Sequence, residues 1–533
     1  MGKPAVDYAL YLVTDSSAAI LGDRSLSHAV EASLKGGVTI VQLREKTADT
    51  AHLTSVARQL HGITRRYNVP LLINDRVDVA LAVGCEGVHI GQDDMPLSTA
   101  RQLLGPDAVI GVTVSTVDEA LRACAGGADY LGIGTVYATP TKTNTKEIIG
   151  TAGVRHILAA IAAAGYDTTP TVCIGGLNGS NLQRVLFQSA APAKALDGAA
   201  VVSAVMAAPD PEAAARDLVG LVRNPPAFQL DMDMGKGKGK GKGAAAADVS
   251  SVLAQVPAVV RSVHDATPLS HNMTNLVVQN FAANVALCMG ASPIMANYGA
   301  EAADLCKLGG ALVVNMGTVT AEGLANYLTA LRAYNHAGRP VVFDPVGAGA
   351  TSIRRAAVKT ILSSAYLDVI KGNEGEIKTV FGDDGGGEQQ HQQRGVDSTS
   401  TLDAPQKARL VRDLAAREKN VVVMTGATDF VSDGARTFAV DNGCEYLGVV
   451  TGTGCTLGTA ISAAVASRPA DRLVAVIAAV LHFEIAAELA AERPEVRGPG
   501  TFVPAFLDEL FRIRQATARG DLAWLARANV RSV

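Results

Sequence analysis

A low-complexity segment near the middle of the chain divides it into two domains that are expected to fold separately, residues 1–226 and 249–533. Residues 224–248 read NPPAFQLDMDMGKGKGKGKGAAAAD. Alternating glycine and lysine followed by alanine buries little apolar surface and fixes little backbone, so we expect a flexible linker over residues 227–248. The lysines could instead form a basic arm for nucleic acid or acidic lipid, but glycine at every second position, without interleaved aromatic residues, favours a linker.

Composition limits the classes of function. A chain of 533 residues is long enough for two ordinary cores, and a formal net charge of -4 gives no reason to expect nucleic acid as a partner. The apolar runs are short and broken by charges, so no membrane span is expected. Seven scattered cysteines without a CxxC pair, and no signal-peptide pattern, predict a cytoplasmic protein that handles small molecules, with free thiols and no zinc site.

The first domain contains eight short apolar runs, each followed by a helical pattern. The expected strands cover residues 9–14, 39–43, 70–73, 87–90, 109–113, 130–133, 171–174 and 198–202. Eight strand–helix units in about 225 residues predict an α/β fold of the (β/α)8 TIM-barrel type. The active site of such a barrel lies at the carboxyl ends of its strands.

Polar residues gather at these strand ends. Gln42, Arg44 and Lys46 alternate to one side after the second strand, and carboxylates follow the third and fourth strands. Carboxylates at neighbouring strand ends can share a Mg²⁺ ion with phosphate oxygens. The sixth strand leads into a loop of hydroxyls with a lysine, residues 134–142, and glycines end the seventh. These features predict two phosphorylated ligands, one of them held by backbone N–H groups.

The motifs QLREK, NDRVDVA, GVHIGQDDMP, GVTVS, TPTK and CIGGL, in this order, resemble thiamine phosphate synthase over the whole first domain. The resemblance implies that hydroxymethylpyrimidine diphosphate is joined to hydroxyethylthiazole phosphate, with Mg²⁺ and release of pyrophosphate. It implies metal binding by Asp75 and Asp94. The implied substrate-binding residues are Gln42, Arg44, Lys46, Asn74, Thr113, Thr139, Thr141, Lys142, Gly176, Val202 and Ser203.

Two observations qualify this resemblance. Ala138 stands where the family often has proline, and we expect this change to affect loop rigidity only. A thiazole tautomerase shares the barrel, but the intact NDR, QDD and TPTK motifs favour the synthase.

The second domain alternates strands and longer helices. Strands expected at residues 311–315, 341–344, 369–371 and 421–425 predict an open α/β sheet with ligands at its carboxyl edge. Residues 449–451 lead into the turn 452–455, GTGC, and a long alanine-rich helix. Glycines at the start of a helix let backbone N–H groups bind an anion, although a tight packing turn explains them as well. A P-loop is excluded because the chain has no GxxxxGK[ST].

Further motifs change this balance. DPVGAG provides Asp344, KGNEGE provides Lys371 and Glu376, and VVVMTG provides Thr425. With SPIMA, these motifs resemble hydroxyethylthiazole kinase, a member of the ribokinase-like superfamily. The resemblance implies ATP as co-substrate, with its phosphates contacted by Lys371 and Thr425, and Mg²⁺ positioned by Asp344 and Glu376. It also implies that Met295 touches the thiazole and that the turn with Gly452 and Gly454 forms an anion hole.

Cys455 occupies a position where relatives in the superfamily have an aspartate base, whereas thiazole kinases are similar to this chain in having cysteine. A thiol needs a lowered pKa to act as a catalytic base, which a helix N-terminus can supply. Orientation and charge neutralisation can carry phosphoryl transfer without a base. Lys371 replaces the arginine common in the family, which keeps the charge but loses the bidentate fork. Residues 383–405 are expected to form a disordered insertion.

Together the two resemblances imply consecutive steps, because a kinase that makes thiazole phosphate is joined to a synthase that consumes it. The predicted linker favours proximity over a sealed channel. Two alternatives stay open: one half only binds its ligand as a regulatory or scaffolding module, or the kinase half phosphorylates a pyrimidine. Cys455 and the SPIMA stretch favour thiazole. Such kinases form trimers, so the resemblance implies a homo-oligomer built from trimers, such as a trimer or a hexamer.

Overall fold

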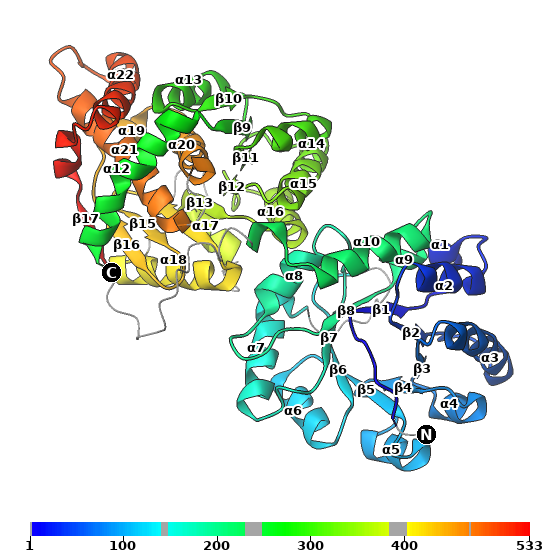
Figure 1. Cartoon of the computed structure of the whole chain (residues 1–533). Coiled ribbons are helices and arrows are strands. Elements are labelled where there is room, and N and C mark those ends of the chain that lie inside the picture. The colour runs from blue at the N-terminus through cyan, green and yellow to red at the C-terminus, as the bar shows by residue number, and fades with distance from the viewer. Residues whose placement is uncertain (1–2, 140–147, 230–247, 383–401, 468–470) are drawn as a thin grey trace. The chain divides into compact units, whose positions relative to one another are not determined.

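The chain forms two compact units, Met1–Pro226 and Ala227–Val533. The computed structural model describes residues 3–139, 148–229, 248–382, 402–467 and 471–533 (Figure 1). Residues 230–247 of the predicted linker lie outside this description, so each unit is treated separately below.

The first unit is a closed barrel of eight parallel strands in sequence order, which confirms the predicted TIM-type fold. Its strands are β1 (Leu10–Val13), β2 (Ile40–Leu43), β3 (Leu71–Asn74), β4 (Gly87–Ile90), β5 (Val109–Val114), β6 (Tyr130–Ile133), β7 (Thr171–Ile174) and β8 (Gly198–Val201). Its helices are α1 (Ala18–Leu21), α2 (Leu26–Lys35), α3 (Thr50–Arg66), α4 (Val77–Val83), α5 (Leu97–Leu104), α6 (Val117–Ala125), α7 (Gly150–Ala163), α8 (Leu182–Ser189), α9 (Ser203–Met206) and α10 (Pro211–Arg223).

Alternation along the barrel strands separates two cores. In β1, Leu10 and Leu12 face outward into the apolar layer shared with the helices, whereas Tyr11 and Val13 face the barrel interior. The same alternation turns Gln42 of β2 and His89 of β4 toward the interior, where both line a cavity. The carboxyl ends of the strands then carry the predicted site residues to one rim.

The second unit contains a nine-stranded sheet in the order β10-β9-β11-β12-β13-β14-β15-β16-β17. Its strands are β9 (Leu269–Met273), β10 (Ser292–Ile294), β11 (Ala311–Asn315), β12 (Val341–Asp344), β13 (Val369–Asn373), β14 (Val421–Thr425), β15 (Asp429–Ser432), β16 (Thr437–Val440) and β17 (Val530–Ser532). The pairs from β10 to β14 are parallel and those from β14 to β17 are antiparallel. The open α/β sheet is therefore confirmed, with an antiparallel extension that the sequence did not predict.

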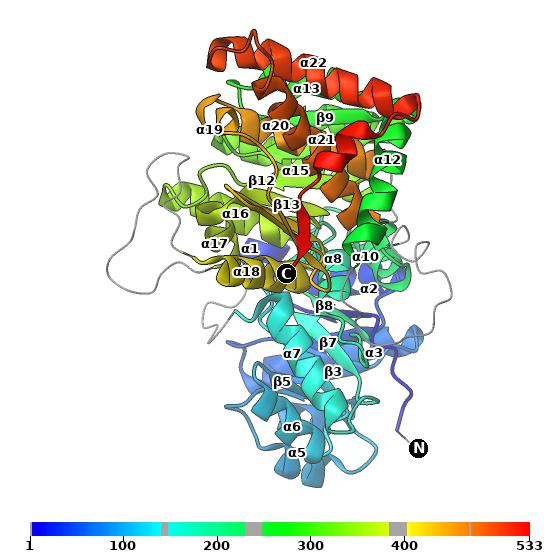
Figure 2. The same cartoon turned by 90° about the vertical axis from the view of Figure 1, so that its left-hand side faces the viewer.

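Helices cover both faces of this sheet (Figure 2). One layer holds α12 (Val249–Ala266), α13 (Gln279–Met289), α20 (Thr453–Ser467), α21 (Arg472–Ala491) and α22 (Pro499–Ala518). The other holds α14 (Ala302–Leu305), α15 (Ala321–His336), α16 (Ser352–Ser364), α17 (Glu374–Phe381) and α18 (Ala404–Glu418). Val313 packs toward the first layer and its neighbours Leu312 and Val314 toward the second, so β11 is apolar on both faces as a buried parallel strand must be.

Helix α21 corrects the expectation that no segment approaches the length of a membrane span. Among the described residues it is the one helix long and apolar enough for this, with 20 residues and a mean hydropathy of 2.0. However, 89% of the tested window is buried inside the unit, where α12, α20 and α22 pack around it. Its composition is therefore that of a central core helix.

Two boundaries differ from the predictions. Phe228, in the predicted linker, is buried and its ring stacks on Tyr366 with centroids 4.5 Å apart, so residues 227–229 pack as part of the second unit. The expected insertion ends early, because the Asp403 side chain caps α18 at Ala404, and residues 383–401 lie outside the described chain. Ahead of the glycine turn, Val449 ends the short helix α19 (Tyr446–Val449).

Candidate functional sites

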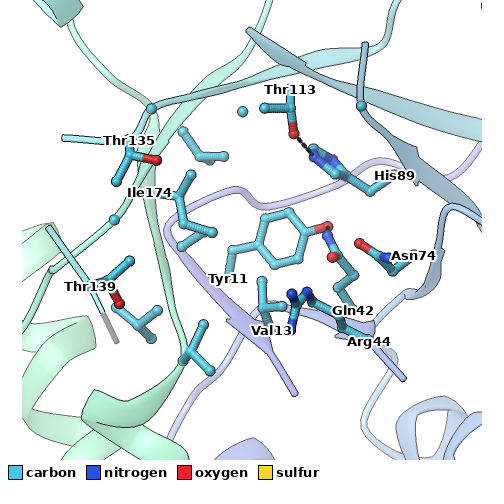
Figure 3. Close-up of a pocket in the computed structure, with 18 of the residues that line it drawn as sticks. Tyr11, Val13, Gln42, Arg44, Asn74, His89, Thr113, Thr135, Thr139 and Ile174 are labelled. Carbon is cyan, nitrogen blue, oxygen red and sulfur yellow. Dashed lines mark hydrogen bonds between the residues drawn. The ribbon is translucent and has the colours of Figure 1, made fainter. Parts of the chain in front are cut away.

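A cavity of about 800 Å³ opens at the carboxyl ends of the barrel strands. Figure 3 shows Gln42, Arg44 and Asn74 on one side of it, Thr135 and Thr139 on the other, and the Tyr11 ring between them. Every described residue predicted for the first site lines this cavity: Gln42, Arg44, Lys46, Asn74, Asp75, Asp94, Thr113, Thr139, Gly176, Val202 and Ser203. Thr141 and Lys142 lie outside the described residues.

Asp75 and Asp94 form a carboxylate pair at the rim. Asp75 takes a left-handed backbone conformation with φ of 61°, and its carboxylate lies 3.5 Å from Lys46 Nζ. Burial raises the pKa of Asp75, and the hydrogen bond with Asp94 and the charge of Asp94 raise it further, while Lys46 lowers it. Two carboxylates that oppose each other's ionisation in this way favour a cation between them. The pair therefore fits the predicted Mg²⁺.

The opposite side of the cavity is built from glycine and hydroxyl groups. Gly176 has φ of +67°, and a Cβ atom there would lie 2.9 Å from the carbonyl oxygen of Ala138. The loop that carries Thr139 can therefore approach the end of β7 only because glycine stands at position 176. Ser203 begins the short helix α9 directly after β8. Backbone N–H groups and hydroxyls on this side suit a phosphate.

The second site lies at the carboxyl edge of the sheet in the second unit. Lys371 Nζ lies 3.4 Å from both carboxylate oxygens of Asp344, and Asn315 Nδ2 donates to Asp344 Oδ2 over 2.8 Å. Asn275 Nδ2 donates to Asn315 Oδ1 over 3.0 Å and lies 3.4 Å from Cys455 Sγ. A continuous polar chain thus joins the thiol to the buried ion pair.

This arrangement does not lower the pKa of Cys455. Burial raises the pKa of the thiol to about 11, with a further rise from the charge of Asp344, although Lys371 and the two asparagines oppose it. The position of Cys455 at a helix start therefore does not lower the thiol pKa in the protein without ligands. Cys455 is a neutral thiol at physiological pH, and burial likewise raises the pKa of Asp344.

Glu376 is held between two loops. Its carboxylate accepts hydrogen bonds from the backbone N–H groups of Gly347 and Asn373, both over 2.8 Å, and it completes a capping box at the start of α17. Burial and the charge of Asp344 raise the pKa of Glu376 to about 7. Glu376 thus joins the loop after β12 to that after β13, and its charge, with that of Asp344, gives this edge two carboxylates suited to a metal–nucleotide complex.

The remaining predicted residues lie along the same edge. Gly454, at the start of α20, faces the Lys371 ammonium, since a Cβ atom there would be 3.6 Å from Nζ. Gly452 has φ of +89° and packs against Val278, and Thr425 ends β14 beside β13. Met295 follows β10, which is separated from β11 by β9. Met295 is therefore three strand positions away from β12, the strand that ends in Asp344.

Comparison with known proteins gives the same division of the chain. Residues 10–205 match the family profile of thiamine monophosphate synthase, and residues 260–516 match the hydroxyethylthiazole kinase family. The chain is 42% identical over 534 residues to the probable thiamine biosynthetic bifunctional enzyme of Schizosaccharomyces pombe, with 99% of each chain covered. It is 35% identical over 541 residues to the thiamine biosynthetic bifunctional enzyme of Saccharomyces cerevisiae, with 96% of each covered. The chain belongs to the family of bifunctional thiamine biosynthetic enzymes.

The barrel is thus the thiamine phosphate synthase half of a bifunctional enzyme, and the second unit is its hydroxyethylthiazole kinase half. The kinase half is also 43% identical over 268 residues to the hydroxyethylthiazole kinase of Moorella thermoacetica, covering 50% of this chain and 96% of that one. Both predicted families are therefore confirmed, and both predicted sites lie at the strand ends where each fold places ligands.

Sequence reasoning missed several residues of this bifunctional enzyme. Tyr11 and His89 line the synthase cavity, and each is a polar residue at an inward-facing position of an otherwise apolar strand, a signal that was available. In the kinase half, Arg354 donates to the carbonyl oxygens of Met316 and Val346 over 2.7 Å, and of Gly317 over 2.9 Å. It fixes the two loops that follow β11 and β12, a contact that no sequence pattern shows.

Proposed function

We propose that the two sites perform consecutive steps: the kinase half phosphorylates hydroxyethylthiazole with ATP, and the synthase half joins the phosphate to hydroxymethylpyrimidine diphosphate. The observation that carries this proposal is the pairing of two cavity walls in the barrel. A cationic wall with a carboxylate pair faces a wall of glycine and hydroxyl groups, as two ligands with different numbers of phosphate charges require.

In the synthase half, Arg44, Lys46 and Asn74 would hold the diphosphate, and Asp75 and Asp94 would hold Mg²⁺. The metal would neutralise the charge that develops on the leaving pyrophosphate. Lys46 lies beside Asp75, so its ammonium group can also neutralise the oxygens of the leaving pyrophosphate. The thiazole nitrogen then attacks the pyrimidine methylene carbon, and this step needs no protein nucleophile.

Residues on the opposite wall would hold the second substrate. Thr139 and the backbone around Gly176 and Ser203 would bind the thiazole phosphate. The approach of the Ala138 carbonyl to Gly176 supports this placement, because it brings the hydroxyl-bearing loop and the end of β7 together. Roles for Thr141 and Lys142 as phosphate contacts remain part of the proposal.

In the kinase half, Lys371 and Thr425 would contact the ATP phosphates, and the turn with Gly452 and Gly454 would bind the transferring phosphoryl group. Backbone N–H groups at the start of α20, reinforced by the helix dipole, stabilise negative charge there. Asp344 and Glu376 would position Mg²⁺. Cys455, as a neutral thiol, would orient the substrate hydroxyl, and charge neutralisation would do most of the catalytic work.

Assembly and location are further parts of the proposal. Leu276, Val277 and Tyr298 are large, exposed apolar residues in loops at the site edge of the kinase half, with 68%, 72% and 62% of their surfaces exposed. Exposed apolar side chains of this kind support self-association. The trimer-based homo-oligomer itself is proposed from the resemblance to trimeric kinases. The seven cysteines are all unpaired, which supports a cytoplasmic protein. Mass photometry across a range of concentrations tests the assembly.

A coupled assay tests the two activities together. The protein is incubated with ATP, Mg²⁺, hydroxyethylthiazole and hydroxymethylpyrimidine diphosphate, and ADP and thiamine phosphate are measured. We expect both products. Asp344→Ala should abolish both, and supplying thiazole phosphate directly should then restore thiamine phosphate but not ADP. ADP without thiamine phosphate would refute the synthase half of the proposal. Phosphorylation of hydroxymethylpyrimidine in place of the thiazole would refute the kinase half.

A further inference from the structure

Five polar side chains form a continuous hydrogen-bonded chain across the floor of the synthase cavity. Gln42 Nε2 donates to the Tyr11 hydroxyl over 2.7 Å, and the Tyr11 and Tyr130 hydroxyls lie 2.7 Å apart. The Tyr130 hydroxyl lies 2.7 Å from His89 Nδ1, and His89 Nε2 lies 2.8 Å from Thr113 Oγ1, the last bond being drawn in Figure 3. Four members line the cavity, whereas Tyr130 lies beneath them. We call these five residues the floor relay.

The barrel makes room for the floor relay with two glycines. A Cβ atom at Gly111 of β5 would lie 2.0 Å from Tyr130 Cζ, and one at Gly132 of β6 would lie 2.9 Å from His89 Cε1. Any side chain at Gly111 would displace the Tyr130 phenol, so the strand positions and the relay depend on each other. The relay is therefore built into the barrel, because five different strands supply its members.

The hydrogen bond that Gln42 donates fixes the donor and the acceptor of every other bond in the floor relay. Burial raises the pKa of both Tyr11 and Tyr130 above the ordinary value, so each hydroxyl keeps its single hydrogen. Because Gln42 donates to Tyr11, Tyr11 must donate to Tyr130, and Tyr130 to His89 Nδ1. A neutral imidazole then carries its hydrogen on Nε2 and donates it to Thr113.

One end of the floor relay presents a hydrogen-bond acceptor to the ligand, and the other end presents a donor. Among the described residues, neither Gln42 Oε1 nor the hydrogen of the Thr113 hydroxyl has a hydrogen-bond partner. The cavity floor therefore offers an acceptor at Gln42 and a donor at Thr113. An aminopyrimidine edge carries an amino donor beside ring-nitrogen acceptors, which matches this pair. An oxo analogue carries a carbonyl acceptor beside a ring N–H donor, which reverses it.

We propose that the floor relay is the specificity device by which the synthase half accepts an aminopyrimidine and rejects its oxo analogue, with Tyr130 as a positioning residue that never touches the substrate. The inference rests on the proposed synthase function. To suit the carbonyl of the oxo analogue, the Gln42 amide must turn over, so that its Nε2 faces the ligand and its Oε1 faces the Tyr11 hydroxyl. Because the relay is continuous, that change also reverses both tyrosine hydroxyls and the His89 tautomer. A cavity with independent donors would adapt at one residue alone.

The test removes one link that lies outside the cavity. Tyr130→Phe deletes the hydroxyl that joins Tyr11 to His89 and keeps the ring, so Gln42 and Thr113 can then turn independently. Tyr8→Phe is the matched control, because the Tyr8 ring lies 5.1 Å from that of Tyr130 and, among the described residues, its hydroxyl bonds to none of the relay. The full-length protein is assayed with thiazole phosphate, Mg²⁺ and either the 4-amino or the 4-oxo pyrimidine diphosphate.

The measured quantity is the ratio of kcat/KM for the amino substrate to kcat/KM for the oxo substrate. We expect Tyr130→Phe to lower this ratio by about tenfold or more, as the loss of one enforced buried hydrogen bond implies, and Tyr8→Phe to leave it within about twofold. If Tyr130→Phe fails to fold, Tyr11→Phe takes its place. It breaks the relay one link nearer Gln42 and should lower the ratio to a similar extent.

Two results would overturn the inference. An unchanged ratio in both relay variants, with both substrates slowed equally, would mean that the network is only structural. An equal fall in Tyr8→Phe would mean that packing, and not hydrogen-bond direction, sets the ratio. Absence of product from the amino substrate in the wild-type protein would instead remove the synthase function, and the inference with it.

Discussion

Replacing Lys371 by methionine tests the electrostatics of the kinase site. Lys371 and Asp344 form a buried ion pair, with side chains 4% and 0% exposed and a separation of 3.4 Å. Lys371→Met keeps most of the aliphatic stem and removes the cation. Deleting one partner of a buried pair typically costs about 3–5 kcal/mol. In the variant, Asn315 still donates to Asp344, and the Asp344 carboxylate can also bind a proton. We therefore expect the free energy of unfolding to fall by about 3 kcal/mol at pH 8, at the lower end of this range.

The cost should depend on pH in a defined direction. Burial raises the pKa of Asp344 and the charge of Lys371 lowers it, so the pKa rises further in the variant. A carboxyl group whose folded-state pKa exceeds its unfolded value destabilises the fold above the unfolded pKa. That penalty grows by up to about 1.4 kcal/mol per pH unit until the folded-state pKa is reached. The cost of Lys371→Met should therefore be largest at pH 8 and smaller near pH 5.5.

The chain provides its own probe for this measurement. Trp524 is the single tryptophan in the sequence and is buried in the kinase half, so its fluorescence during urea unfolding reports on that unit alone. Unfolding is measured without Mg²⁺ or ATP at both pH values. Synthase activity with supplied thiazole phosphate should be unchanged, which separates loss of the site from general misfolding.

Lys378→Met is the matched control. Lys378 lies 2.7 Å from Glu374, but its side chain is 23% exposed, and Lys407 also pairs with Glu374 at 3.4 Å. We expect this variant to lose less than about 1 kcal/mol at either pH. A cost below about 1 kcal/mol for Lys371→Met at pH 8, or one that does not shrink at pH 5.5, would refute the ion-pair reasoning.

Three further predictions follow. Phe228→Ala should destabilise the kinase half by about 3 kcal/mol in the same fluorescence assay, because it leaves a cavity where the buried Phe228 ring stacks on Tyr366. An unchanged stability would mean that residues 227–229 belong to the linker, as the sequence predicted. Cys455→Ser should keep kinase kcat within about tenfold, since the thiol pKa of about 11 leaves it neutral; a thiolate limb below pH 9 in the wild-type rate profile would contradict this. Asp94→Asn should raise the Mg²⁺ concentration for half-maximal synthase activity by about tenfold or more and leave the kinase unaffected, and equal effects on both would argue against a local metal site.

Strand positions were predictable where burial is a local property. Buried parallel strands are continuous apolar runs, so β4, β6 and β7 in the barrel, and β11, β12 and β14 in the sheet, have the expected bounds. Strand β9 was not predicted because Ser270, His271 and Asn272 are polar although fully buried. Ser270 bonds to Ser462 and Asn272 to Thr459, both on α20, and no local pattern shows such distant partners.

The sites show the same limit. The family motifs placed the residues of the synthase cavity because each motif ends a strand, and strand ends meet at one rim. The raised pKa of the Cys455 thiol could not be read from its position at a helix start, since it depends on burial and on the charge of Asp344 at the end of β12. The floor relay was equally hidden, because hydrogen-bond direction emerges only when all five side chains are in place.

The burial of α21 has a consequence for biogenesis. Its covering helices come from both ends of the kinase half, with α12 before it and α22 after it along the chain. During translation, α21 leaves the ribosome before α22 exists, so a helix with the length and hydropathy of a membrane anchor is exposed until the chain beyond residue 518 has emerged. We therefore expect chaperones and the membrane-insertion machinery to bind the nascent kinase half. Variants that loosen the packing of α22 should lower the amount of protein in the cell, through degradation, before they lower the activity of the folded enzyme.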